Sequence, residues 1–99
     1  MNVRYSLVAA ARADLAEIYE YTVNRWGYQQ ADSYQASLTR HFAGISEHPL
    51  SGVARDDLRK GVRTYPAESH IVYYRVRRGE VQVLRVLHSR QNANRAFGR

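Results

Sequence analysis

The sequence predicts an α+β fold with an N-terminal strand and an antiparallel helical hairpin that packs on an antiparallel β-sheet. Apolar residues recur at helical spacing from about residue 9 to residue 26, and again from residue 31 to residue 45. Residues 62–88 are instead rich in β-branched and aromatic side chains, which are typical of strands. With 99 residues in total, we expect one domain that spans residues 1–99.

The first strand and the first helix follow one another closely. Residues 2–7 alternate polar and apolar side chains, which predicts a short half-buried strand. From about Ala9 one apolar stripe of a helix carries Leu15, Ile18, Tyr19, Thr22 and Trp26. The acidic residues of this helix lie in its earlier turns, where they suit the helix dipole: Asp14, Glu17 and Glu20. Gly27 then supplies the left-handed conformation that ends a helix.

A second helix is predicted by the same spacing of apolar residues. Its stripe consists of Ala31, Tyr34, Leu38, Phe42 and Ile45. Pro49 ends the pattern, and the short linker makes the two helices antiparallel neighbours. Gly44 lies inside this helix and costs about 1 kcal/mol relative to alanine, so we expect it to mark a close contact.

The second half of the chain is predicted to be a loop followed by a meander. Residues 49–61 read as a loop because of their proline, glycine and charged residues. The strands predicted after it span residues 62–65, 70–76 and 81–88. Pro66 fits an edge or a strand terminus, and residues 77–80 fit a hairpin turn. We expect the polar, basic tail of residues 89–99 to be frayed or to form one weak turn.

The charge of the chain is unevenly distributed. There are 15 Lys and Arg residues against 9 Asp and Glu residues, for a net charge of +6, and Lys60 is the only lysine. Residues 1–54 carry four cations and five acids, whereas residues 55–99 carry eleven cations and four acids. This asymmetry predicts an anionic partner, and arginine favours planar contacts to phosphate or carboxylate.

Several classes of protein are excluded by composition. The chain has no cysteine, which excludes disulfides, thiolate zinc sites and cysteine nucleophiles. No apolar run approaches the ~20 residues of a membrane span, and the N-terminus lacks the core of a signal peptide. We therefore expect a soluble cytoplasmic protein without a membrane partner.

Signatures of metal, cofactor and catalytic chemistry are weak. His41 and His48 stand two helical turns apart, about 10.5 Å, which is too far to share an ion. The adjacent acids Asp56 and Asp57 have no histidine near them in sequence. A glycine-rich phosphate loop and a nucleophile elbow are both absent from the sequence. We expect no metal and no cofactor.

Arginine, tyrosine and histidine are interleaved along the predicted sheet: Arg63, His70, Tyr73, Tyr74, Arg75, Arg85, His88 and Arg90. The period of two places Tyr73 and Arg75 on one face and Tyr74 on the other. Such a surface can bind RNA or an acidic peptide through its cations and rings. It could also cleave RNA, with an imidazole moving protons and guanidinium groups stabilising charge. We favour binding over cleavage.

Short motifs run in a fixed order along nearly the whole chain. They are Ala13-Asp14-Leu15 with Ile18 and Tyr21, Arg25-Trp26-Gly27 with Gln30-Ala31 and Tyr34, Asp56-Asp57-Leu58-Arg59, and Gly61-Val62-Arg63. The most distinctive motifs are residues 69–76 (SHIVYYRV) and 83–88 (VLRVLH), with Arg90 two residues further on. In this order they resemble the ParE branch of the RelE/ParE toxin superfamily, whose fold is a helical hairpin on an antiparallel sheet.

The resemblance implies the toxin of a type II toxin–antitoxin pair. The implied partner is a ParD-like antitoxin with an acidic, disordered C-terminal segment that folds onto the toxin in a hetero-oligomer. ParE-type members poison DNA gyrase, whereas RelE-type members cut messenger RNA on the ribosome. The chain has no tyrosine after Tyr74 and one lysine, which resembles the ParE branch. We therefore expect a non-enzymatic toxin that binds DNA gyrase.

The residues expected to contact antitoxin or target are Arg59, Arg63, Tyr73, Arg75, Arg85, His88 and Arg90. The alternative is a RelE-like ribosome-dependent endoribonuclease, whose catalytic residues would be Arg63, Arg85, His88 and Arg90. A plain nucleic-acid-binding module is a third interpretation, which rests on charge alone.

Overall fold

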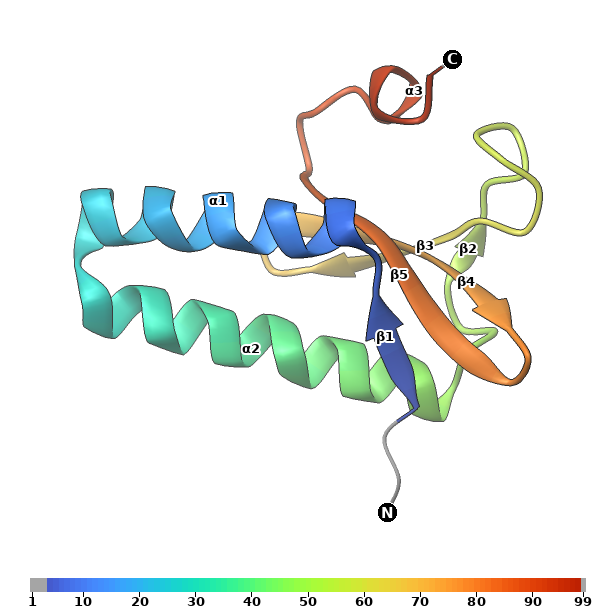
Figure 1. The fold of residues 1–99 in the computed structure, drawn as a ribbon, viewed down its shortest axis with the longest axis horizontal. Coiled ribbons are helices and arrows are strands. Elements are labelled where there is room, and N and C mark those ends of the chain that lie inside the picture. Colours follow the sequence, from blue (N-terminus) through green and yellow to red (C-terminus); the bar gives the residue numbers. More distant parts are fainter. Residues whose placement is uncertain (1–3, 99) are drawn as a thin grey trace.

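The computed structural model describes residues 4–98 and confirms the predicted α+β fold (Figure 1). The elements are β1 (Tyr5–Leu7), α1 (Ala9–Trp26), α2 (Tyr28–Glu47), β2 (Val53–Ala54), β3 (Arg63–Ala67), β4 (His70–Arg77), β5 (Glu80–His88) and α3 (Ala93–Ala96). The first strand was predicted to begin at residue 2, and residues 2 and 3 lie outside the described residues. No helix in residues 4–98 is long and apolar enough to cross a membrane.

The two long helices form the predicted antiparallel hairpin (Figure 1). Gly27 is the one residue between them, and its φ of 90° explains why a glycine stands there. The second helix buries Ala31, Leu38, Phe42 and Ile45, which belong to the predicted apolar stripe.

The close contact lies at Gly52, and the prediction for Gly44 is wrong. A Cβ atom added at Gly44 would meet nothing within 4 Å. At Gly52 it would lie 2.4 Å from the hydroxyl of Tyr74 and 2.7 Å from the carbonyl oxygen of Thr64. That hydroxyl accepts a hydrogen bond from the Gly52 N–H (2.9 Å) and donates one to the carbonyl of Pro49 (2.8 Å).

The sheet has the strand order β1-β5-β4-β3-β2. Strands β3, β4 and β5 pair antiparallel, as predicted. The structure adds a short antiparallel pair between β2 and β3 and a parallel pair between β1 and β5. The predicted loop of residues 49–61 contains β2, a strand too short to show a period of two. Because β2 pairs only with Arg63 and Thr64, the rest of β3 has an open side, which suits Pro66.

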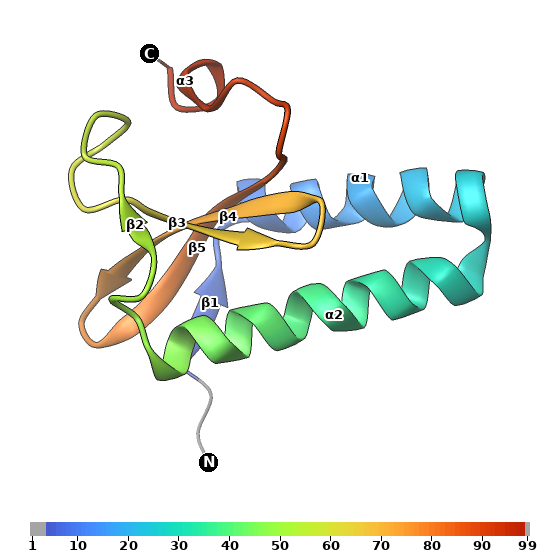
Figure 2. The same ribbon diagram turned by 180° about the vertical axis from the view of Figure 1, so that it is seen from behind.

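An apolar core lies on each face of the sheet. The first packs Leu38, Phe42 and Ile45 of α2 against the sheet, including Val72 and Tyr74. The second contains Leu58, Val62, Tyr73, Leu84 and Leu87, so Tyr73 and Tyr74 lie on opposite faces, as predicted. The single turn predicted for the tail is α3, and residues of this segment pack on the second core. The sheet accordingly lies between α2 and α3 (Figures 1 and 2).

A bulge in β5 allows both cores to form. Tyr73 is opposite Arg85 whereas Tyr74 is opposite Val83, so Leu84 is an extra residue in the ladder. The bulge shifts by one residue the alternation of side chains between the two faces of the sheet. Val83 and Val86, which are three residues apart, therefore both pack in the first core. Strand β1 ends opposite Val83, and the edge of β5 beyond that point faces α1.

Candidate functional site

The helical hairpin projects past the end of the sheet (Figure 1). A groove of about 600 Å³ is lined by residues of this region. Its walls come from the inner faces of α1 and α2, and its floor from the start of β4 and the end of β5. Ile18, Tyr21 and Trp26 supply its apolar surface, and the polar lining includes His70 and His88. Two helices of the first half of the chain and two strands of the second half therefore build one site.

An ion pair anchors the inner end of the groove. Asp14 accepts hydrogen bonds from Arg85 Nε (2.8 Å) and Nη2 (2.9 Å), and its Oδ2 atom also accepts from the Val86 N–H (2.9 Å). Asp14 is 8% exposed, so this carboxylate lies in the core between α1 and β5. The bond to Asp14 raises the pKa of Arg85 above its usual value, which keeps the guanidinium charged.

The role predicted for Asp14, an interaction with the helix dipole, is wrong. The first turn of α1 contains no acidic residue, and Asp14 bonds to β5. The sequence did carry a signal for this contact. Asp14 falls at helical spacing between the buried residues Ala11 and Thr22, and an acid among buried positions indicates a paired charge.

A chain of polar contacts crosses the floor of the groove. The Ser69 N–H donates to the Tyr34 hydroxyl (3.1 Å), which lies 2.7 Å from His70 Nδ1. The rings of His70 and His88 meet edge-on with centroids 5.4 Å apart. Burial lowers the pKa of His70, and the neighbouring His88 lowers it further, against the opposing effect of Asp14. The hydrogen bond between the Tyr34 hydroxyl and His70 Nδ1 therefore joins α2 to the start of β4 across the floor of the groove.

Exposed aromatic side chains form the outer rim of the groove. Trp26 is 61% exposed and Tyr21 is 57% exposed, and the two rings meet edge-on at 6.4 Å. The Arg25 guanidinium lies 5.3 Å from the Trp26 ring and 5.7 Å from the Tyr21 ring. The apolar stripe of α1 predicted a packed Trp26, but the hairpin continues past the sheet and leaves this ring without a covering layer.

Two of the predicted contact residues, Arg85 and His88, line the groove. Arg90 lies two residues after His88, and its N–H donates to His88 Nδ1 (3.2 Å). Tyr73 is buried on the opposite face of the sheet, where burial raises its pKa. Arg59 stacks there on Phe97 at 5.2 Å.

The remaining predicted residues lie elsewhere on the sheet. Arg75 bonds to Gln82 toward the β4–β5 turn. Arg63 donates from Nη1 to the carbonyls of Leu50 (3.2 Å) and Gly52 (2.7 Å), so it supports a loop. Ala67, the partner of His70, is four positions along β3 from Arg63, a distance of about 13 Å. The structure therefore does not bring the four candidate nuclease residues together.

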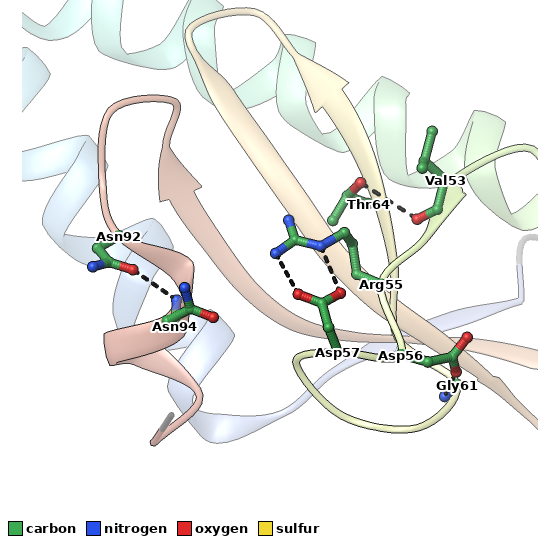
Figure 3. A network of polar contacts seen from close by, with 8 residues as sticks. All are labelled: Val53, Arg55, Asp56, Asp57, Gly61, Thr64, Asn92 and Asn94. Atoms are coloured by element: carbon green, nitrogen blue, oxygen red, sulfur yellow. Dashed lines mark hydrogen bonds and ion pairs between the residues drawn. The ribbon is translucent and has the colours of Figure 1, made fainter.

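The other titratable candidates take part in local structure. Asp57 pairs with Arg55 through two contacts of 2.9 Å, and Asp56 accepts from the Gly61 N–H (2.7 Å) in the same loop (Figure 3). Asn92 caps α3 by accepting from the Asn94 N–H (2.9 Å). Glu68 lies 2.9 Å from His41, and this contact lowers the pKa of Glu68. Within residues 4–98 no three His, Cys, Asp or Glu side chains are grouped to hold a metal ion.

Comparison with known proteins identifies the family. The family described as "ParE toxin of type II toxin-antitoxin system, parDE" matches residues 5–93. Toxin ParE1 of Mycobacterium tuberculosis is 41% identical over 96 residues, covering 96% of this chain and 98% of the relative. Toxin ParE1 of Caulobacter vibrioides is 40% identical over 94 residues, covering 95% and 97%. Toxin ParE of Escherichia coli is 34% identical over 91 residues, covering 89% and 86%.

The fold has a counterpart among solved structures. A chain of the structure titled "Chromosomal ParDE TA system from P. aeruginosa" superposes with a TM-score of 0.75 at 25% identity, covering 87% of this chain and 95% of that one. The sequence matches cover the helical hairpin and the sheet together, and the structural match agrees with them. The chain belongs to the ParE toxin family of type II toxin–antitoxin systems.

Proposed function

We propose that this toxin is neutralised by a ParD-like antitoxin, a segment of which fills the groove, and that it acts by binding DNA gyrase without a covalent step. The observation that carries the antitoxin site is the exposed aromatic rim of the groove. Tryptophan, tyrosine and arginine are the residues that dominate binding energy at protein interfaces, and Trp26, Tyr21 and Arg25 form one cluster here.

The lining of the groove fits an amphipathic acidic segment. Ile18 and the rim aromatics offer apolar contacts, while Arg25 and His88 offer positive or hydrogen-bonding partners. Asp14 already neutralises Arg85, and Glu17 also lines the groove. We therefore expect apolar contacts to supply most of the affinity and charge to orient the segment. Contacts of Arg59, Arg63, Tyr73 and Arg75 with antitoxin or target stay predictions.

Membership of the ParE family supports gyrase as the target, and the arrangement of residues supports a binding mechanism. A general acid–base site needs its groups within hydrogen-bond reach of one reacting centre. Arg63 stands apart from His88, and Arg85 is paired with Asp14. We therefore assign the residues of the predicted nuclease set no catalytic role, and we place the activity in the cytoplasm, where gyrase acts.

Titration of purified toxin with its antitoxin tests the groove. Replacing Trp26 with alanine is expected to weaken binding by about 30-fold, or ~2 kcal/mol, because an anchor ring is lost. The matched control is Tyr28→Ala, an aromatic residue that is 70% exposed and lies outside the groove lining. The free energy of unfolding of each variant should lie within about 0.5 kcal/mol of that of the parent protein, since both rings are exposed. If the two variants bound antitoxin with equal affinity, the antitoxin would not bind in the groove.

A supercoiling assay tests the target. Purified toxin is expected to inhibit supercoiling by gyrase, and prior addition of antitoxin should restore it. The RelE-like alternative predicts unaffected gyrase and cleavage of messenger RNA on translating ribosomes, with the cleavage lost in His88→Ala. That result would replace gyrase with the ribosome as the target and make the toxin an enzyme.

A further inference from the structure

A second charged surface lies at the end of the molecule away from the groove. The turn between β4 and β5 and the tip of the helical hairpin are at opposite ends in both views (Figures 1 and 2). Four arginines lie at or beside this turn, and we call them the basic end: Arg4, Arg75, Arg77 and Arg78. Arg4 is held there because its carbonyl oxygen accepts a hydrogen bond from the Val81 N–H (3.0 Å). Glu80 is the acid beside them, and it forms no ion pair with them within residues 4–98.

The strand register places Arg75 and Arg77 of the basic end on the sheet face that α2 does not cover. Val81 and Val83 of β5 face the first core, so Gln82 between them faces away. Gln82 is opposite Ser6 of β1 and Arg75 of β4, so these three residues share that outer face. Alternation puts Arg77 there as well, together with Glu80, its partner on β5. A shallow hollow of about 210 Å³ runs beside them and is lined by Ser6, Arg77, Arg78, Glu80 and Gln82.

The side chains of the basic end are available to a ligand. Arg75 donates from Nε to Gln82 Oε1 (2.7 Å), a bond that orients the guanidinium plane. Its terminal nitrogens have no hydrogen-bond partner within residues 4–98. Arg77 and Arg78 are exposed and form no ion pair in the described part of the chain. The surface thus presents fixed positive charge at the tip of a two-stranded turn.

The composition of the surface distinguishes two kinds of anionic partner. Protein interfaces need apolar anchors in addition to charge. The large apolar residues exposed within residues 4–98 are Tyr21, Trp26, Tyr28, Leu50, Val53 and Val76. Only Val76 is near the turn, and alternation places it on the opposite face from Arg75 and Arg77. The surface near the turn carries arginine, serine, glutamine and one acid, Glu80, without apolar anchors on that face. A surface on which arginines outnumber acids and apolar anchors are missing is typical of contacts to the phosphates of a nucleic acid.

We propose that the basic end binds the phosphate backbone of duplex DNA without reading its sequence. This inference does not rest on the proposed function, because it uses no residue of the groove. Since the two surfaces are at opposite ends, a toxin whose groove is filled can still contact DNA.

The test is binding of the full chain to a fluorescent 20-base-pair duplex over a range of salt concentrations. Four arginine–phosphate contacts predict that log K falls against log salt with a slope of about −3 to −4. The test variant combines Arg75→Gln, Arg77→Gln and Arg78→Asn, where asparagine suits the positive φ of 54° at residue 78. This variant is expected to retain a slope of about −1, since one contact remains.

A second triple variant controls for net charge. Arg40→Gln, Lys60→Gln and Arg95→Gln remove the same three charges from exposed positions on α2, a loop and α3. This control should keep the slope of the parent protein within about one unit. Equal losses in the two triple variants would overturn the proposal, as would the absence of duplex binding. Displacement of the duplex by polyglutamate of equal charge at equal concentration would also overturn it, in favour of an acidic protein partner.

Discussion

Asp14 completes the edge of the sheet at the point where β1 stops. Strand β1 pairs with β5 only as far as Val83, so the Val86 N–H has no strand partner on that side. The Asp14 carboxylate accepts that N–H and holds Arg85 with its other bonds. The Asp14 side chain thus accepts the hydrogen bond that the carbonyl of a neighbouring strand would otherwise accept. This contact fixes the spacing between α1 and the sheet at the inner end of the groove.

We predict that Asp14→Ala lowers the free energy of unfolding by about 2–4 kcal/mol, because it leaves the Arg85 charge and the Val86 N–H unpaired. Urea denaturation measures the change. Glu20→Ala, an exposed acid on the same helix, should cost less than about 0.5 kcal/mol. Similar losses in the two variants would show that both acids act through the helix dipole.

His70 makes stability depend on pH. Its pKa is lowered in the folded protein, mainly by burial, so the unfolded chain takes up this proton at a higher pH than the folded one. The contribution of neutral His70 is therefore complete above the ordinary histidine pKa of about 6.5 and is lost as the pH falls through the folded value.

We predict that His70→Gln reduces the loss of unfolding free energy between about pH 7.5 and about pH 5.5, because the group that titrates is gone. Urea denaturation at the two pH values measures this. The control is His48→Gln, since His48 is exposed and should leave the pH dependence unchanged. An NMR titration that finds the pKa of His70 at or above the ordinary histidine value of about 6.5 would contradict the prediction.

At the scale of elements, the long helices and the three main strands could be predicted because their signals are local. A stripe such as Leu38–Phe42–Ile45 is visible in a short window of sequence. Strand β2 and the bulge at Leu84 could not be predicted, because each exists only through pairing with a distant strand. The parallel pairing of β1 with β5 likewise depends on residues that are remote in sequence.

The glycines of α2 and of the following loop give a matched test of local packing. Gly44→Ala is expected to stabilise the protein by about 0.5–1 kcal/mol, since the helix gains propensity and the added Cβ meets nothing. Gly52→Ala is expected to destabilise it by about 1–3 kcal/mol, since the added Cβ would lie 2.4 Å from the Tyr74 hydroxyl. Thermal unfolding should therefore shift in opposite directions for the two variants, and a destabilised Gly44→Ala would reveal a contact at that helix face.

At the scale of the whole molecule, the sequence predicted an arginine-rich sheet surface, whereas the structure divides those residues among separate surfaces. Arg85 and His88 reach the groove, Tyr73 lies in the second core, and Arg75 belongs to the basic end. The groove itself could not be predicted, because it forms where the helical hairpin extends beyond the sheet. That extension depends on how the helices are placed against strands that are remote in sequence. Exposed Trp26 is the consequence of that excess length.

The separation of the two ends predicts independent binding. Trp26→Ala should weaken antitoxin binding and leave the salt dependence of DNA binding unchanged. The triple variant of the basic end should reduce the salt dependence of DNA binding and leave antitoxin binding unchanged. Because residues at opposite ends share no partner, the free-energy changes of the combined variant should add within about 0.5 kcal/mol for each ligand. Isothermal titration calorimetry measures the free energy of antitoxin binding, and fluorescence anisotropy measures that of duplex DNA binding, on the same protein preparations. A loss of antitoxin affinity in the triple variant comparable to that of Trp26→Ala would mean that the antitoxin extends across the sheet to the basic end.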